Sequence, residues 1–328
     1  MTGFTARNLA LAAAVILTAV AGARFPARAQ ADYPSRVVRI IVPTAAGGAT
    51  DLTARSAAPA LASALGQPFI VENRPGAHGL TAAAALLKER RDGYTLMMMA
   101  TSQSALPALY DGIPYDPVDD FSPIALLSIA PVILVVNASL PVSSVADLVR
   151  YAKTHPRDIN YGYQSNTTSL SCGQLAKLAG FEAVGVPFAG SAQVATELLA
   201  GRLTFTLMTA EQAKAHVESG RLRALATGGA RRATAFPELP TLQELGYPIE
   251  GTGWFGLVGP SGMPQPVVDK LYAALKEHYI AKAGQAGIIK AGLEAGDEGP
   301  AEFAARMRRE IARWIKLGAD LGVAKSKL

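Results

Sequence analysis

The residues of this chain that are best placed to do chemistry surround two adjacent glycines, Gly47 and Gly48. The apolar stretch 37–42 before them predicts a buried strand, and the Ala/Leu-rich stretch 52–65 after them predicts a helix with Asp51 at its positive end. Such a turn presents unpaired backbone N–H groups to an anion, and glycine lets a ligand approach the main chain closely. The pattern therefore predicts the first wall of a ligand site. The alternative is a tight strand-to-helix connection that binds nothing.

Small polar residues also follow the other strands that the hydrophobic pattern predicts. The predicted strand 94–99 ends at a Thr-Ser-Gln-Ser cluster, and the predicted strand 159–163 ends at a run of hydroxyl and amide side chains. In open α/β sheets, ligands gather at the carboxyl ends of the strands. The candidate ligand-binding residues at these ends are Gly47, Gly48, Asp51, Thr101, Ser102, Ser165, Asn166, Thr168, Gly190, Ser191 and Thr209.

Strands and helices alternate along the chain, which predicts an α/β fold with parallel strands and right-handed crossovers. The apolar run 124–137 is broken by Pro131 and predicts strands that pass into a second lobe, and the stretch 254–260 predicts the return. We expect a first lobe of residues 32–127 plus 253–328 and a second lobe of residues 128–252. Further strands are expected at 68–73, 183–186, 203–208 and 222–226, and further helices at 81–91, 145–153, 170–179, 193–199, 211–219, 241–245, 266–280, 284–291 and 300–321. The last of these helices carries an apolar stripe of Phe303, Met307, Ile311, Trp314 and Ile315.

The N-terminal residues 1–29 predict a signal peptide. They contain a positive Arg7, an apolar stretch from 9 to 23 that is shorter than the ~20 residues of a membrane-spanning helix, and a small-x-small ending at Ala29. Cleavage after Ala29 or Ala31 would release a mature protein into the periplasm, and an uncleaved anchor is the alternative. Three arginines and no acidic residue lie in this segment, so the formal charge of +5 leaves +2 for the mature chain. That charge is too small to indicate nucleic-acid binding.

Residue patterns typical of catalysis or metal binding are missing from the sequence. The four histidines are scattered, and the single cysteine, Cys172, matches no metal pattern and cannot form an internal disulfide. Gly251-x-Gly253-x-x-Gly256 matches the dinucleotide-binding pattern, but it precedes a predicted strand instead of a helix. No pair of nucleophile and base emerges. We therefore expect a binding protein that is no enzyme and holds neither a metal nor a cofactor.

Six motifs, in order along the chain, resemble those of the Bug (TctC-like) extracytoplasmic solute receptors, the substrate-binding proteins of tripartite tricarboxylate transporters. The motifs are Pro43-x-x-x-Gly47-Gly48-x-Thr50-Asp51, Val71-Glu72-Asn73-Arg74-Pro75-Gly76-Ala77, Asp92-Gly93-Tyr94-Thr95-Leu96, Pro114-Tyr115-Asp116-Pro117-Val118-x-Asp120-Phe121, Val186-Pro187-Phe188-x-Gly190-Ser191 and Trp254-Phe255-Gly256-Leu257. The resemblance covers essentially the whole mature chain. It implies a type II periplasmic-binding-protein fold, in which two α/β lobes joined by two crossing strands close on a ligand like a hinge.

The resemblance also implies a small carboxylate as the ligand, held largely by backbone N–H groups and ordered water from two opposing loops. It adds three candidate site residues. Thr44 and Ala46 stand where the family usually has Phe and Pro, so the first wall is expected to be smaller and more polar. Met208 aligns with a position where some members place an Asp that meets a ligand amino group, so we expect a ligand without an ammonium group.

The expected function is that of a monomeric periplasmic receptor that captures a small carboxylate and delivers it to the membrane components of a tripartite tricarboxylate transporter. Three alternatives stay open at this point. The first is an orphan receptor that presents its ligand to a sensor protein. The second is an exported enzyme on the same fold. The third is a two-lobed protein whose cleft has another use.

Overall fold

The computed structural model describes residues 33–281 and 285–327. The compact unit Arg36–Leu328 contains two large β-sheets and a small two-stranded one. The predicted signal peptide lies outside the described residues. Within the described ranges, no helix is both long enough and apolar enough to cross a membrane.

The first sheet has six strands in the order β12-β5-β11-β3-β1-β2. β1 runs parallel to β2 and β3, whereas β11 runs antiparallel to both of its neighbours, β3 and β5. The bounds are β1 Val38–Val42, β2 Phe69–Asn73, β3 Thr95–Ala100, β5 Phe121–Ala130, β11 Gly253–Pro260 and β12 Glu294–Ala295. The long helices of this part are α3 Ala49–Leu65, α4 Leu80–Leu87, α11 Gln265–Leu275 and α13 Pro300–Asp320. We call this sheet and its helices the first lobe.

The second sheet has five strands in the order β10-β6-β9-β7-β8. Here β7 runs parallel to β8 and β9, and β6 runs antiparallel to β9 and β10. The bounds are β6 Val132–Asn137, β7 Asn160–Tyr163, β8 Val184–Pro187, β9 Phe205–Thr209 and β10 Leu222–Thr227, with the helices α7 Val145–Thr154, α8 Asn166–Ala179, α9 Ser191–Leu199 and α10 Ala210–Glu218. We call this sheet and its helices the second lobe.

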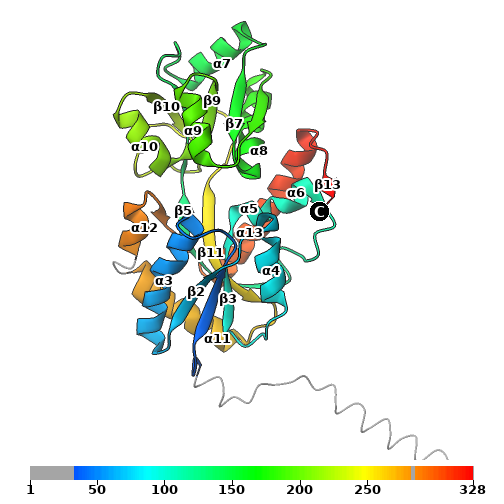
Figure 1. Cartoon of the computed structure of the whole chain (residues 1–328), viewed down its shortest axis with the longest axis vertical. Coiled ribbons are helices and arrows are strands. Elements are labelled where there is room, and N and C mark those ends of the chain that lie inside the picture. Colours follow the sequence, from blue (N-terminus) through cyan, green and yellow to red (C-terminus); the bar gives the residue numbers. More distant parts are fainter. Residues whose placement is uncertain (1–32, 282–284, 328) are drawn as a thin grey trace, which may run out of the picture. The chain divides into compact units, whose positions relative to one another are not determined.

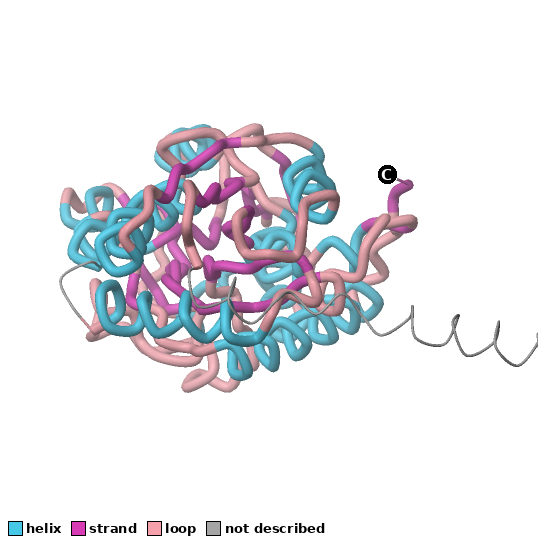
Figure 2. The backbone as a smooth tube through the Cα atoms, turned by 90° about the horizontal axis from the view of Figure 1, so that it is seen from below, coloured by secondary structure: helices cyan, strands magenta, loops and turns pink. Residues whose placement is uncertain are grey.

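Two chain crossings join the lobes, and Figure 1 shows β5 and β11 running toward the upper sheet. β5 ends at Ala130 and β6 begins at Val132, so Pro131 marks the first crossing, as the sequence predicts. Figure 2 shows most of the strands in the interior with helices around them, and the strand near the C-terminus at the outside. Shorter elements complete the chain: η1 Ala77–Gly79, α5 Thr101–Ser104, α6 Leu106–Leu109, β4 Tyr110–Asp111, η2 Lys276–Ile280, α12 Ala286–Lys290 and β13 Ser326–Lys327.

Each sheet has its own buried core. In the first lobe, Ile41 and Met97 of the sheet pack with Leu86 of α4 and with Phe303 and Met307 of α13. The second sheet is covered on both faces, by one cluster that contains Leu134, Leu175 and Phe205 and by another that contains Ile133, Val194 and Met208. The lobe boundaries predicted at 127/128 and 252/253 stay predictions.

The lobes also meet away from the crossing strands, at α8. Leu170 of α8 is 2% exposed and packs with Ala105, Ala108, Trp314 and Leu317 of the first lobe. The Lys177 side chain, further along α8, donates a hydrogen bond to the Asp320 carbonyl at the end of α13. α8 is therefore held from both lobes.

Two expectations about local structure are wrong, and two short helices were missed. Residues 241–245 form turns instead of a helix, because Gly246, with a φ of +88°, ends the single turn that the Thr241 hydroxyl caps. Ile315 is 43% exposed, and Leu317 takes its place on the buried stripe of α13. The short helices α5 and α6 were not predicted.

Candidate functional site

The register of the strands fixes where the candidate residues lie. β11 begins opposite the carboxyl end of β5, where Gly253 pairs with Ala130, and its next residues pair with the carboxyl end of β3. In the second sheet, Val132 at the start of β6 pairs with Thr209 at the end of β9. β1 is parallel to β3, and β7 is parallel to both β8 and β9. The carboxyl ends of these parallel strands, in both sheets, therefore lie toward the crossing at Pro131 (Figure 1). The candidate residues of both lobes therefore lie at the two edges that approach this crossing.

The turn between β1 and α3 is exposed at Ala46, Gly47 and Gly48, and Thr44 is half-buried. Gly47 has a φ of +90°, a left-handed value that favours glycine, and Gly48 is the N-cap of α3 with a φ of −80°. The first N–H groups of a helix have no partner inside the helix, and the helix dipole adds partial positive charge there. This turn can therefore hold an anion with neutral main-chain donors.

Asp51, a predicted ligand-binding residue, forms hydrogen bonds to this turn and to its neighbours in the structure. Its side chain is 2% exposed and accepts hydrogen bonds from Gly47 N, Asn73 Nδ2 and Arg55 Nε, each at 2.9 Å. Burial alone would raise the pKa of the Asp51 carboxyl, but the bonds from Arg55, Gly47 and Asn73 outweigh burial, and the pKa lies below its ordinary value. The carboxylate is ionised and accepts hydrogen bonds from three protein donors.

Thr101 and Ser102 have separate surroundings at the start of α5. The Thr101 hydroxyl is buried, accepts a hydrogen bond from Trp254 N at 2.6 Å and donates to Trp254 O at 3.3 Å. It ties the end of β3 to the start of β11. Ser102 is exposed, so of these two side chains it is the one that can meet a ligand.

In the second lobe, Ser165 is the centre of a small hydroxyl network. Its Oγ lies 3.1 Å from the Thr167 hydroxyl and 3.0 Å from the Thr168 hydroxyl, and it accepts from Thr168 N at 3.3 Å. Asn166 is half-buried and is the first residue of α8, so it lies on a helix and not in a loop. The structure brings these three predicted residues, Ser165, Asn166 and Thr168, together at one helix start.

The helices that follow the strands begin in two different ways. α3 and α9 have glycine N-caps, Gly48 and Gly190, without a side-chain cap. α8 and α10 have Ser165 and Thr209, whose hydroxyls each accept a first-turn backbone N–H. The starts of α3 and α9 therefore keep more donors for a ligand than the starts of α8 and α10.

Gln212 joins the remaining candidates of the second lobe. Its side chain donates to the Ser191 hydroxyl at 2.6 Å, and its backbone N donates to the Thr209 hydroxyl at 3.4 Å. Met208 is 4% exposed and packs in the core with Ile133 and Val135, so it presents little surface to a ligand.

Three residues of this arrangement were not among the sequence candidates: Arg55, Asn73 and Gln212. A signal existed for two of them. Arg55 follows Asp51 by four residues on a predicted helix, a spacing at which opposite charges meet. Asn73 ends a predicted strand beside that of the Gly47–Gly48 turn.

The described residues contain few groups suited to metal binding or nucleophilic catalysis. Among these residues, no group of three or more His, Cys, Asp or Glu side chains could hold a metal ion. Cys172 is fully buried, and burial raises the pKa of its thiol to about 12, which keeps it protonated at neutral pH.

Comparison with known proteins identifies the family. Residues 53–322 match the model of the "Tripartite tricarboxylate transporter family receptor". Protein BugT of Bordetella pertussis is 31% identical over 321 residues, which cover 96% of this chain and 98% of BugT.

Two solved structures share the fold over most of their length. One, described as R. palustris Rpa4515 with adipate, is 34% identical, with a TM-score of 0.77, over 90% of this chain and 100% of that one. The other, MatC (Rpa3494) from Rhodopseudomonas palustris with bound malate, is 29% identical, with a TM-score of 0.72, over 87% of this chain and 100% of that one. The two α/β lobes are thus those of a periplasmic binding protein, and the chain belongs to the TctC (Bug-type) family of tripartite tricarboxylate transporter receptors.

Proposed function

We propose that this protein captures a small carboxylate between its two lobes and delivers it to the membrane components of a tripartite tricarboxylate transporter. The observation that carries the proposal is the match, over nine-tenths of the chain, to a relative whose structure contains adipate, a dicarboxylate. The exposed, glycine-capped start of α3 supports it, since neutral donors there suit an anion.

The proposed ligand-binding residues form two walls. The first wall comprises Thr44, Ala46, Gly47, Gly48 and Ser102, and the second comprises Ser165, Asn166, Thr168, Gly190, Ser191 and Thr209. Asp51 and Thr101 hold the first wall in shape through their hydrogen bonds. Binding between the walls would favour the closed arrangement, because only that arrangement lets the ligand contact both lobes.

A thermal-shift screen tests the proposal. The panel contains succinate, glutarate, adipate, malate, citrate, aspartate, glutamate and nicotinate. We expect stabilisation by at least one plain carboxylate, since a ligand at 100 times its dissociation constant adds about 2.7 kcal/mol to the free energy of unfolding. Failure of every acid to bind would contradict the proposed function, and tighter binding of aspartate or glutamate would contradict a ligand without an ammonium group.

Two further measurements test the enzyme alternative and the predicted signal cleavage. Recovery of the bound acid chemically unchanged after long incubation is expected of a receptor and not of an enzyme. N-terminal sequencing of the exported protein is expected to start near Asp32, and recovery of residues 1–29 on the exported chain would contradict cleavage.

A further inference from the structure

The buried side chain of Asp51 belongs to a closed network with Asn73 and Arg55. Asn73 Nδ2 donates to Asp51 Oδ1 at 2.9 Å and to the Thr44 carbonyl at 3.0 Å, so it ties the network to the turn. Arg55 donates through Nε to Asp51 Oδ2 at 2.9 Å and through Nη2 to Asn73 Oδ1 at 3.0 Å. Each of the three side chains therefore contacts the other two.

The network places a negative charge next to the proposed carboxylate site. Asp51 is in the first turn of α3, and its Oδ2 accepts from the N–H of Gly47 in the exposed turn. An anionic ligand at this turn would be repelled by an uncompensated carboxylate. Arg55, one helical turn further on, is the cation that faces it, with half of its side chain exposed.

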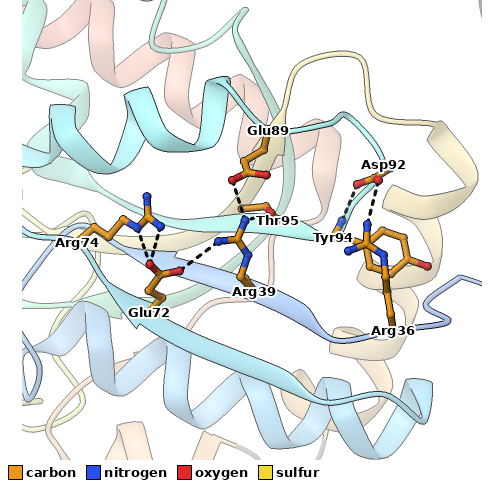
Figure 3. Close-up of polar contacts among 8 residues, drawn as sticks. All are labelled: Arg36, Arg39, Glu72, Arg74, Glu89, Asp92, Tyr94 and Thr95. Carbon is orange, nitrogen blue, oxygen red and sulfur yellow. Dashed lines mark hydrogen bonds and ion pairs between the residues drawn. The ribbon is translucent and has the colours of Figure 1, made fainter.

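The neighbouring arginines are engaged elsewhere. Figure 3 shows Arg74 turned to Glu72, and Arg39 placed between Glu72 and Glu89. Arg74 Nη2 lies 2.6 Å from Glu72 Oε1, and Arg39 Nη2 lies 2.7 Å from Glu89 Oε1. Glu72 and Asn73 are adjacent on β2, so their side chains point to opposite faces of the sheet. Compensation of Asp51 therefore depends on Arg55.

We propose that Arg55 acts on the carboxylate site through Asp51: it pairs with the Asp51 carboxylate beneath the Thr44–Gly48 turn and cancels its charge toward the ligand. The inference rests on the proposed function. It differs from a purely structural role because the effect of Arg55 must scale with the charge of the ligand.

The test compares two ligands and three variants. The ligands are the tightest-binding dicarboxylate of the panel above and its monomethyl ester, which carries one charge fewer. For Arg55→Met, titration calorimetry at low salt is expected to show a loss of affinity of about tenfold for the dianion and about threefold for the ester. High salt should reduce both losses, and Arg55→Lys should retain most of the wild-type affinity.

Arg150→Met is the matched control. Arg150 pairs with Asp147 at the start of α7, in the same residue types but with a more exposed arginine, and it lies away from both walls. This variant should bind both ligands like the wild type. Equal losses for the two ligands in Arg55→Met, no dependence of those losses on salt, or wild-type affinity in that variant would each overturn the inference.

A measurement without ligand tests the network itself. Amide hydrogen exchange at Gly47 should accelerate at least tenfold in Asp51→Ala and change less than threefold in Arg55→Met, since Asp51 still accepts from Gly47 there. Unchanged exchange in Asp51→Ala would overturn the network. If the wild type binds no acid of the panel, the proposed function fails; if it binds and Arg55→Met binds equally well, only the present inference fails.

Discussion

The two proposed walls of the ligand site are built from different interactions. In the first lobe, a buried carboxylate, Asp51, collects three donors at 2.9 Å and fixes the turn that follows β1. In the second lobe, the Ser165 hydroxyl contacts the Thr167 and Thr168 hydroxyls and accepts from one backbone N–H, at 3.0–3.3 Å. Hydrogen bonds to charged groups are stronger than those between neutral groups. We therefore expect the proposed first wall to be more preorganised than the proposed second wall.

The glycine caps make this comparison testable. Neither Gly48, with a φ of −80°, nor Gly190, with a φ of −161°, needs glycine for its backbone, and a Cβ would meet no atom closer than 3.9 Å at either position. A side chain at these positions would therefore enter the space open to a ligand and leave the fold largely undisturbed.

The largest effect is expected from Gly48→Val. We expect a loss of affinity of at least about 100-fold, which corresponds to about 2.7 kcal/mol, while the poor capping by valine lowers the free energy of unfolding by about 1 kcal/mol or less. Gly190→Val should weaken binding about tenfold, because the proposed second wall is expected to be less preorganised. Calorimetry and urea unfolding on both variants would measure this.

Gly287→Val is the control for that comparison. Gly287 is exposed on α12, its nearest neighbour to a Cβ would be Ser56 Oγ at 3.8 Å, and it belongs to neither wall. Affinity should stay at the wild-type value. Wild-type affinity in both Gly48→Val and Gly190→Val would contradict the proposal that these two walls bind the ligand.

A second comparison uses the side chains behind the walls. Asn73→Leu removes a donor from buried Asp51 and should lower the free energy of unfolding by about 2 kcal/mol. Gln212→Leu removes the neutral contact to Ser191 in the second wall and should lower it by about 0.5–1 kcal/mol. Urea unfolding monitored by circular dichroism would measure both. Equal losses of unfolding free energy in the two variants would mean that the first wall is no more strongly fixed than the second.

Much of the fold could be predicted from local sequence. Short apolar runs marked most of the strands, and Pro131 marked the first crossing, because these signals depend on a few adjacent residues. The short helix α5 was missed because four residues carry no periodicity, and Ile315 was misplaced because a 21-residue helix offers more than one apolar stripe.

The arrangement within the site was harder to predict. The turn at Gly47 and Gly48 has a local signature, whereas the partner of Asp51 lies 22 residues away at Asn73. A sequence shows that an aspartate begins a helix, but only the fold shows whether its carboxylate faces a ligand or the interior. In the structure the Asp51 carboxylate is bound by Gly47, Asn73 and Arg55, and its predicted contact with a ligand stays a prediction.

The smallest expected effect is a difference between the two walls in how their contribution to the free energy of unfolding depends on acid pH. Because the pKa of Asp51 is lowered in the folded protein, its stabilisation is complete above the pKa of an unfolded aspartate, about 4, and is lost as pH falls through the lower, folded value. The hydroxyls of Ser165, Thr167 and Thr168 do not titrate in this range. The difference in unfolding free energy between the wild type and Asp51→Asn should therefore narrow below pH ~4, whereas the difference for Ser165→Ala, about 1 kcal/mol from the lost cap, should stay constant. A constant difference for Asp51→Asn would mean that its carboxylate is not what fixes the first wall.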